Sequence, residues 1–547
     1  MGKAGMDDKP AKRIAVVGCG PRGLGALEAL AARLSREGSP MSVDVYDPFR
    51  MLGAGPNFDP NESEVCRLNI PIRDIEIDPP GLTRCPPFVE WLSDAPDPDD
   101  FPQRAELGRY LEMRYADLAE LGVFAITHQI MSVERARRDE NGWWLLAARK
   151  WRGPYAEVLL TLGQPETAPD DQLAEWRRHA ETSSGTLAQA YPAKQLQAQG
   201  ADWAGKTIAI RGFALSAFDI LRVLTTAQGG SFDSGRYYRS GREPERILPF
   251  SFDGRPPFPK PETEALDARF EPTAQETETF AEAIAQAAAA TSQQARDLVD
   301  AALTPAVARI LRHCGADAGA QAVADWLGTE WEDPGSQEVS GSRETLDDGI
   351  AMAEGARAPS IGFAVGQVWR KWQNEFRSGF NPTDTPPETA QTLIGFDEGL
   401  KRYSYGPPVA SSRELQALIE AGVVSLAFSA DPEIALTSAG WTLKKSDNTA
   451  EASVMIDSVL PNPDLEAVRS PLLSGLQEDG LLTPFANGYG AHTDADGSLI
   501  GKNGQSAPGL CLLGRLALGS VAAADSLHDC FGAASNRWAE GVVDRLG

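Results

Sequence analysis

The sequence predicts an α/β protein with two Rossmann-like dinucleotide-binding units and a mainly helical insertion. Three observations support this prediction. A β-branched apolar run at 13–17 ends in glycine, and a similar run at 206–212 does the same. From about 259 to 387 the chain is rich in Ala, Glu, Gln and Trp, with apolar residues at helical spacing. With 547 residues, the chain is long enough for roughly three or four domain-sized units.

The first unit contains the glycine turn at 18–23, between an expected strand at 13–17 and an expected helix at 24–34. Its first glycine permits a tight turn, the second lets backbone approach a pyrophosphate, and the third lets the helix pack on the strand. A second strand at 41–46 ends in an acid that can accept hydrogen bonds from a ribose. The alternative is a tight turn in an unrelated sheet. We therefore predict a dinucleotide site made of Gly18, Gly20, Pro21, Arg22, Gly23 and Asp47.

The other expected elements continue the α/β pattern on both sides of the insertion. Mostly loop is expected at 51–102, and helices at 105–121 and 214–225. Strands are expected at 143–146, 158–163, 206–212, 423–428, 454–457 and 510–514, before a closing helix from Asp525. The chain then divides into a first nucleotide-binding domain at 12–204 completed by 480–547, a second unit at 205–260 and 400–479, and a helical insertion or cap at 261–399.

Charge and composition exclude several classes of partner and site. The chain has 51 basic and 77 acidic residues, and this net charge of −26 repels nucleic acid and anionic membrane surfaces. The sequence has no run of about 18 consecutive apolar residues, so we predict no membrane span. The six cysteines and five histidines are scattered, so we predict no metal site. Scattered free thiols are typical of a reducing compartment, and we expect a cytoplasmic protein.

The first turn extends to Gly-Cys-Gly-Pro-Arg-Gly-Leu-Gly at 18–25, and further landmarks follow it in order. They are Gly-Ala-Gly-Pro-Asn-Phe at 53–58, Arg-Leu-Asn-Ile-Pro at 67–71, Phe-Pro-Gln-Arg at 101–104, Gly-Arg-Tyr-Leu at 108–111, Tyr-Arg-Ser-Gly-Arg-Glu-Pro at 238–244 and Leu-Leu-Gly-Arg at 512–515. This series resembles a bacterial flavoprotein family that includes FAD-dependent urate hydroxylases and aspartate N-monooxygenases. The resemblance implies a flavin monooxygenase-like fold with FAD at the first turn.

The second turn departs from the family pattern. Gly212 and Ser216 are expected at a bound NADPH or NADH, but Ala214 stands where a glycine usually lies against the phosphates, and its methyl group can crowd them. Gln164 also stands where related flavoproteins often carry histidine. A degenerate fold kept for packing is the alternative. If the nicotinamide site is used, Arg239 and Arg242 are expected to pair with a 2′-phosphate and to favour NADPH; otherwise they are surface arginines.

Two bound nucleotides indicate hydride transfer from NADPH or NADH to flavin, followed by oxygen transfer to a nucleophilic atom of the substrate. The function expected from the resemblance is a monooxygenase that N-hydroxylates a small amine or amino acid, with molecular oxygen as co-substrate. Alternatives are a flavin-dependent dehydrogenase or oxidase, a carbon hydroxylase of a small nitrogen heterocycle, and a non-catalytic flavin-binding protein. The sequence leaves the substrate and the oligomeric state open.

Several further residues are candidates for the site. The resemblance places Asn69 beside the flavin, with a local turn amide as the alternative, and Gly514 and Arg515 near the cofactor where the last strand ends. Substrate candidates are Arg67, Arg73 and Arg104, each a possible bidentate carboxylate ligand or else a structural ion-pair partner, and His492, which is either a proton-tuning group or an ordinary loop histidine. The face around Trp369 and Trp372 is expected to be core.

Overall fold

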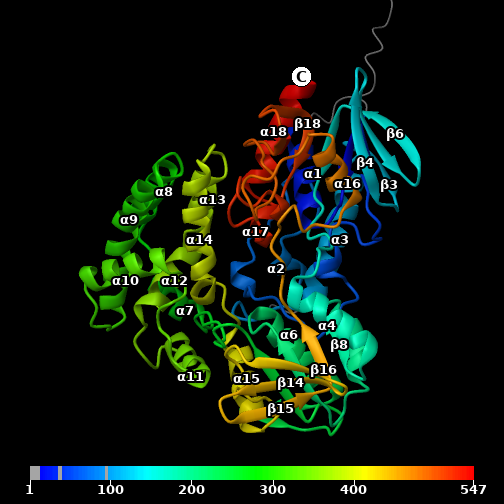
Figure 1. Cartoon of the computed structure of the whole chain (residues 1–547). Coiled ribbons are helices and arrows are strands. Elements are labelled where there is room, and N and C mark those ends of the chain that lie inside the picture. The colour runs from blue at the N-terminus through cyan, green and yellow to red at the C-terminus, as the bar shows by residue number, and fades with distance from the viewer. Residues whose placement is uncertain (1–12, 35–39, 93–95) are drawn as a thin grey trace, which may run out of the picture.

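The computed structural model describes residues 13–34, 40–92 and 96–547. Two separate parallel sheets and a helical insertion organise these residues (Figure 1). The first sheet lies in the upper part of Figure 1, the second in the lower part, and the insertion fills the left side. The predicted fold class is confirmed.

The first sheet has β1 near its centre because the apolar residues of this strand are buried on both faces. Its pairs are parallel except β17 with β18. The strand order is β17 (Ser498–Ile500), β18 (Ser506–Leu512), β7 (Glu157–Leu160), β1 (Arg13–Val17), β2 (Met41–Tyr46) and β3 (Phe124–Gln129). Residues from the two ends of the chain therefore build one sheet.

Helices from both ends of the chain cover this sheet, and α1 packs on α18. The helices of this part are α1 (Pro21–Arg33), α2 (Phe88–Trp91), α3 (Arg104–Glu120), α16 (Pro471–Glu478), α17 (Leu527–Cys530) and α18 (Ala533–Leu546). Short 3₁₀ helices lie at Pro56–Phe58, Ile72–Asp74 and Arg515–Ala517. An antiparallel sheet of β4 (Val133–Asp139), β5 (Gly142–Ala147) and β6 (Lys150–Tyr155) is inserted before β7.

The second sheet is parallel, in the order β12 (Arg246–Phe250), β9 (Thr207–Arg211), β16 (Val454–Asp457) and β8 (Thr186–Gln189). Its helices are α4 (Asp171–Thr182), α5 (Ala193–Gly200), α6 (Leu215–Leu224) and α15 (Val409–Glu420), with a 3₁₀ helix at Thr226–Gln228. Antiparallel additions are the hairpin β10 (Ser231–Asp233) and β11 (Arg236–Tyr238), and the sheet of β13 (Glu433–Thr437), β14 (Gly440–Lys445) and β15 (Asn448–Ala452).

Two details differ from the sequence-based expectation. The second sheet begins before residue 205, because β8 pairs with β16. The expected strand at 423–428 does not form: only Val424 bridges to Ile247 of β12, since turns on both sides leave too few extended residues. The expected elements at 13–17, 41–46, 105–121 and 454–457 appear within one residue of their predicted bounds.

The insertion is a set of packed helices that shares a hydrophobic core with the second unit. The buried face runs through Val365, Val368 and Trp369 of one helix, across the break at Trp372, and on to Phe376 of the next. Trp372 stacks on Phe280 with ring centroids 4.3 Å apart, so this face is core, as expected. The helices are α7 (Glu264–Asp267), α8 (Ala274–Ala288), α9 (Ser292–His313), α10 (Ala320–Glu332), α11 (Ser342–Ala353), α12 (Ile361–Lys371), α13 (Gln373–Phe380) and α14 (Pro387–Ser404), with a 3₁₀ turn at Ala268–Phe270.

Among the helices of the described ranges, none combines the length and the apolar character that a membrane crossing needs.

Candidate cofactor-binding site

The glycine turn of the first unit connects β1 to α1. Gly18 has a φ of +87°, and a Cβ there would overlap the carbonyl oxygen of Thr161, so the turn requires glycine. At Gly23 a Cβ would press on the Gly18 carbonyl oxygen, so this glycine serves the packing of α1 on β1. At Gly20, in contrast, a Cβ would meet nothing closer than the Cα of Gly55, at 3.6 Å. A Cβ at Gly20 would therefore be in ordinary van der Waals contact with Gly55, and the fold does not force glycine at this position, where the fingerprint lets backbone approach a pyrophosphate.

The N-terminus of α1 has no side-chain cap. Its N-cap residue is Gly20 and its first residue is Pro21, whereas α4 and α8 are capped by Asp170 and Thr273. Uncapped N–H groups at a helix start bind anions through hydrogen bonds and through the positive end of the helix dipole. Gly20 and the uncapped helix together fit the diphosphate of a dinucleotide.

Asp47 follows β2 and lies beside the same turn. It is buried; its Oδ2 accepts a hydrogen bond from the Cys19 N–H at 2.7 Å, and its Oδ1 accepts one from the Phe49 N–H at 2.8 Å. A carboxylate has about four acceptor sites, so two backbone donors fix the group and leave acceptor capacity for a ribose. Burial, together with the charge of Asp47, raises the pKa of the Cys19 thiol far above its usual value, so Cys19 is no nucleophile.

Arg22 belongs to the turn, but its guanidinium is occupied elsewhere. Nη1 donates to the Asp529 carbonyl oxygen at 2.7 Å, Nη2 donates to the Ala524 carbonyl oxygen at 2.8 Å, and the group forms a 2.6 Å ion pair with the Asp529 carboxylate. A buried guanidinium needs such partners for its donors. The Arg22 guanidinium therefore holds the segment 524–529 against α1, and a contact between Arg22 and the cofactor stays a prediction.

Gly514 and Arg515 follow β18 and lie close to Arg22. A Cβ on Gly514 would lie 3.5 Å from Arg22 Nε. Arg515 Nε donates to Gln164 Oε1 at 3.0 Å, and Nη2 donates to the Pro461 carbonyl oxygen at 3.1 Å. Gln164 follows β7 of the first sheet and Pro461 follows β16 of the second. Arg515 thus connects the two units through hydrogen bonds beside the first glycine turn.

The second turn repeats the geometry of the first with one change. Gly212 ends β9 with a φ of +106°, and a Cβ there would overlap Ser458 Oγ. Helix α6 starts after Ala214, again without a side-chain cap, and Ser216 lies half-buried in its first turn. The methyl group of Ala214 is exposed at this helix start. The turn therefore offers an uncapped helix to an anion, with one methyl group beside it.

Arg239 and Arg242 do not lie at the second turn, and their expected pairing with a 2′-phosphate is corrected. Both are exposed. The Arg242 guanidinium lies against Gly229, beyond the C-terminal end of α6, and Arg239 Nη2 donates to the Glu245 carbonyl oxygen at 3.2 Å. The chain passes along all of α6 before it reaches them, which places them at the opposite end of the helix from Gly212.

Arg67 and Arg104 lie together where the first unit meets α6. Arg104 Nε forms a 3.2 Å ion pair with Asp219 Oδ2, and the Tyr191 hydroxyl donates to the same oxygen at 2.8 Å. The Arg67 N–H donates to Asp219 Oδ1 at 3.4 Å, while its exposed guanidinium donates to the Phe101 carbonyl oxygen at 2.9 Å. Asp219, which is 4% exposed, neutralises Arg104. The ion-pair alternative therefore describes Arg104.

Arg73 and His492 each have partners of their own. Arg73 forms ion pairs with Asp99 and Asp74. The His492 ring packs edge-on against Phe485, with centroids 5.5 Å apart. Each of the four expected substrate ligands thus has protein partners, and of the four only Arg67 and Arg104 share one, Asp219.

Asn69 lies half-buried in the loop before the 3₁₀ helix at Ile72–Asp74. Its carbonyl oxygen accepts a hydrogen bond from Lys260 Nζ. Lys260 is buried, and this burial, together with the charge of Arg370, lowers the pKa of its ammonium group to about 7. Lys260 directly precedes the insertion, so the contact joins the start of the insertion to the Asn69 loop.

Comparisons with known proteins bear on this arrangement. Residues 15–165 match a family described as FAD-NAD(P)-binding. The nitrosuccinic acid synthase of Aspergillus oryzae is 30% identical over 254 residues, which cover 42% of this chain. The match spans only 38% of the length of that relative.

Two solved structures align with 98% of the chain and with 100% of their own. The ornithine N-hydroxylase of Kutzneria sp. 744, described with reduced FAD, NADP⁺ and L-ornithine, has a TM-score of 0.52 at 13% identity. The ornithine hydroxylase of Pseudomonas aeruginosa, in a reduced form, has a TM-score of 0.53 at 12% identity. The chain has the fold of these flavin hydroxylases. At such low identity, fold is all that the likeness establishes.

Sequence reasoning missed several polar residues around the candidate site. Lys260, Asp219 and Tyr191 are described above. His528 Nε2 lies 2.7 Å from the Asp74 carbonyl oxygen, and burial lowers the pKa of its ring. Arg377 of α13 is 7% exposed. None of these residues belongs to a sequence motif or a periodic pattern. They can be recognised only once the packing of segments that are distant in sequence is known.

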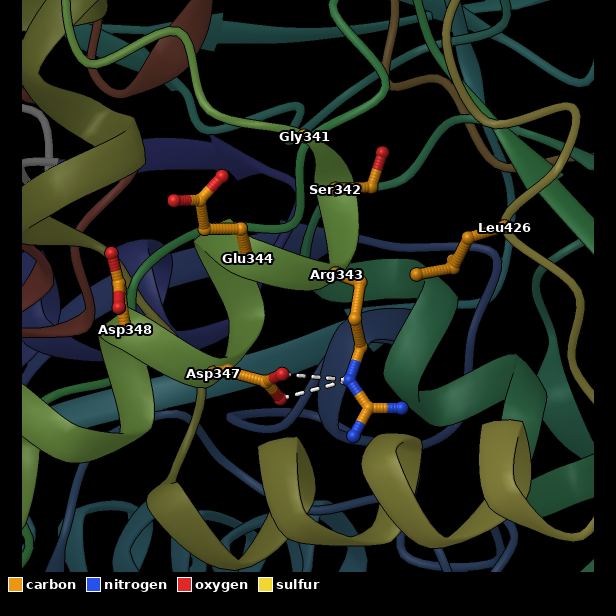
Figure 2. A pocket seen from close by; sticks show the side chains of 7 residues that line it. All are labelled: Gly341, Ser342, Arg343, Glu344, Asp347, Asp348 and Leu426. Atoms are coloured by element: carbon orange, nitrogen blue, oxygen red, sulfur yellow. Dashed lines mark hydrogen bonds and ion pairs between the residues drawn. The ribbon is translucent and has the colours of Figure 1, made fainter.

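A surface hollow of about 680 Å³ lies elsewhere, on the insertion. Figure 2 shows its lining at the start of α11, where Arg343 forms a 2.8 Å ion pair with Asp347. It contains no residue of either glycine turn. Within the described part of the chain, no group of three or more His, Cys, Asp or Glu side chains is placed to hold a metal ion.

Proposed function

We propose that the chain is an FAD-dependent monooxygenase that consumes NADPH or NADH and N-hydroxylates a small amine or amino acid. The observation that supports this most is the first turn, where the fold does not itself require the glycine at Gly20, α1 has no side-chain cap and Asp47 lies beside them. Its occurrence on the fold of flavin hydroxylases, with a partial relative that makes a nitro acid, points the same way. The resemblance to bacterial urate hydroxylases and aspartate N-monooxygenases, and a cytoplasmic location, belong to this proposal.

The residues of the chain would divide the work as follows. Gly18, Gly20, Pro21 and Gly23 form the diphosphate site, and Asp47 accepts hydrogen bonds from the adenosine ribose. Gly212 and Ser216, at the start of α6, would receive the diphosphate of the nicotinamide nucleotide. FAD bound by these residues would supply the redox and oxygen chemistry, namely acceptance of a hydride from the nicotinamide nucleotide and transfer of one oxygen atom of O₂.

The overall reaction is balanced by three small molecules. The amine nitrogen gains one oxygen atom of O₂, and the second oxygen atom leaves as water. NADPH or NADH supplies the hydride, and solvent supplies one proton. This chemistry needs no nucleophilic side chain, and burial raises the pKa of the Cys19 and Cys66 thiols far above the usual range, so neither thiol is a nucleophile.

The test is an absorption spectrum of the purified protein, an anaerobic titration with NADPH and NADH, and then aerobic turnover with amines. We expect a flavin spectrum, bleaching by one nicotinamide nucleotide, and hydroxylamine formation. Reduction of the flavin by an amine alone would replace the proposal with a dehydrogenase or oxidase. A flavin that neither nucleotide reduces would point to a non-catalytic flavin protein, the alternative that Ala214 favours.

A further inference from the structure

Arg377 carries a buried positive charge that has no acidic partner in the described part of the chain. It lies on α13 and is 7% exposed. Its Nη2 donates to the neutral Asn374 Oδ1 at 2.6 Å, and its Nη1 is buried without a hydrogen-bond partner. Among the residues that the structure describes, it forms no ion pair, unlike Arg22 and Arg104. A buried guanidinium in this state is unfavourable unless an anion completes it.

The face of α13 that carries Arg377 is turned toward the segment that follows β18. Asn374, Ser378 and Asn381 lie at helical spacing on the same face. Asn381 contacts this segment directly, because its Oδ1 accepts a hydrogen bond from the Ala522 N–H at 2.8 Å. Asn374 and Ser378 are exposed to solvent. The buried Arg377 guanidinium therefore lies beside solvent-exposed residues of the same helix.

The same segment leads back to the glycine turn. Burial raises the pKa of the Cys530 thiol in this segment, and the positive charges of Arg22 and Arg377 oppose that rise. Arg22 is held by Asp529, the neighbour of Cys530. Arg377 therefore lies on the insertion, across the 522–530 segment from the start of α1.

We propose that Arg377 binds a carboxylate group of the substrate, which is then an amino acid rather than a simple amine. This inference rests on the proposed function and names the substrate class for that site. A carboxylate matches the planar fork of a guanidinium, which can donate two parallel hydrogen bonds to it. A dinucleotide phosphate is the weaker choice, because Arg377 belongs to the insertion and the uncapped starts of α1 and α6 already serve the phosphates.

The test compares the wild-type holoprotein with R377Q and R377K. Binding of succinate, L-aspartate, L-ornithine and putrescine is measured by calorimetry without oxygen, so that no turnover is needed. We expect R377Q to raise the Kd of a carboxylate that the wild type binds by about 10- to 100-fold, the usual effect of losing hydrogen bonds to a charged group. R377K should raise the Kd of the carboxylate by less, because lysine keeps the positive charge but lacks the planar pair of donors of the guanidinium. Putrescine, which has no carboxylate, should bind R377Q as it binds the wild type.

R309Q is the matched control. Arg309 is also on the insertion, but it is paired with Glu276 at 2.7 Å, so its loss should leave carboxylate binding unchanged. FAD content and the Kd of NADPH are measured for every variant and should not change in R377Q.

Three results would overturn the inference. In the first, the wild-type protein binds none of the three carboxylates. In the second, R377Q binds carboxylates as well as the wild type does. In the third, R377Q loses FAD, NADPH or putrescine binding together with carboxylate binding. Failure of the proposed function looks different: the wild type would make no hydroxylamine, while carboxylates would still bind in a manner that depends on Arg377.

Discussion

At the scale of single residues, the first turn shows three glycines with three different constraints. Gly18 is fixed by its own backbone conformation and by Thr161, and Gly23 by the packing of α1. Gly20 has ordinary extended backbone, and a Cβ there would make only ordinary van der Waals contact with Gly55, so the protein itself does not exclude a side chain there. Gly20 is therefore the glycine whose small size serves a ligand rather than the fold.

This difference gives the first prediction. G20A should leave the thermal midpoint of the apoprotein nearly unchanged and sharply reduce the FAD content, because the new methyl group enters the space of the diphosphate. Absorbance at the flavin band and thermal melting of the apoprotein measure the two effects. G395A, at a position of α14 with nothing within 4 Å, should keep its FAD. Full flavin content in G20A would contradict this account of the turn.

At the scale of elements, α1 and α6 both start without a side-chain cap, but they differ in their N-cap residue. Gly20 places no side chain at the start of α1, whereas Ala214 places an exposed methyl group at the start of α6. Glycine is a better N-cap residue than alanine. We therefore expect the Ala214 methyl group, rather than the fold of the second unit, to limit nucleotide binding at this turn.

For this reason A214G should tighten the binding of NADPH. A gain of about 1 kcal/mol corresponds to about a five-fold lower Kd. Titration of flavin reduction, or calorimetry with NADP⁺, measures the change. FAD content, which depends on α1, should stay the same. Weaker nucleotide binding in A214G would show that the methyl group does not crowd the site.

A second contact at this scale joins α1 to α3. Arg114 and Glu28 form a buried ion pair with hydrogen bonds of 2.8 and 2.6 Å, and Arg114 also donates to the Ile77 carbonyl oxygen. R114A should reduce the free energy of unfolding by about 3–5 kcal/mol, because it leaves the Glu28 carboxylate buried and unpaired. Urea and thermal midpoints measure the loss. The exposed pair of Arg135 with Glu478 provides the control, since R135A should change stability by less than about 1 kcal/mol.

At the scale of the whole molecule, a few polar contacts join the three parts of the chain. Arg515 joins the two units, Asp219 of α6 binds Arg104 of α3, and Lys260 at the edge of the insertion binds the Asn69 carbonyl. Among these residues, Lys260 is the one whose charged form is disfavoured by burial, since the pKa of its ammonium group is about 7. The stability of this junction therefore depends on pH.

The direction of this dependence follows from linkage. A lysine with a folded pKa of about 7 and an unfolded pKa of about 10.4 is more protonated in the unfolded chain between these values. The Lys260 contribution to stability therefore rises from pH 7 to pH 10 and is lost as pH falls through 7. The unfolding free energy of wild type minus that of K260M should increase over this range, by at most about 1.4 kcal/mol per pH unit. Parallel melts of both proteins measure it, and a constant difference would contradict the buried charge.

Local sequence predicted the nucleotide-binding elements well and the polar contacts poorly. The bounds of β1, β2 and α3 agree with expectation because each is set by a local pattern of apolar residues and turn glycines. No sequence pattern predicted the antiparallel sheet at 433–452. Its strands are short and largely polar, and they are defined by their pairing with each other. The placement of Arg239 and Arg242 failed because their distance from Gly212 along the chain carries no information about which end of α6 they reach.

The sequence by itself determined the glycine turns, the strand–helix–strand units and the helical character of the insertion, since these depend on interactions within a few residues. Only the tertiary structure decided which charges meet. Arg22 pairs with Asp529 across more than five hundred residues, and Arg377 is left without an acid although the chain has 77 of them. Pairing of buried charges depends on distance in space and on desolvation, and neither is encoded in the order of neighbouring residues.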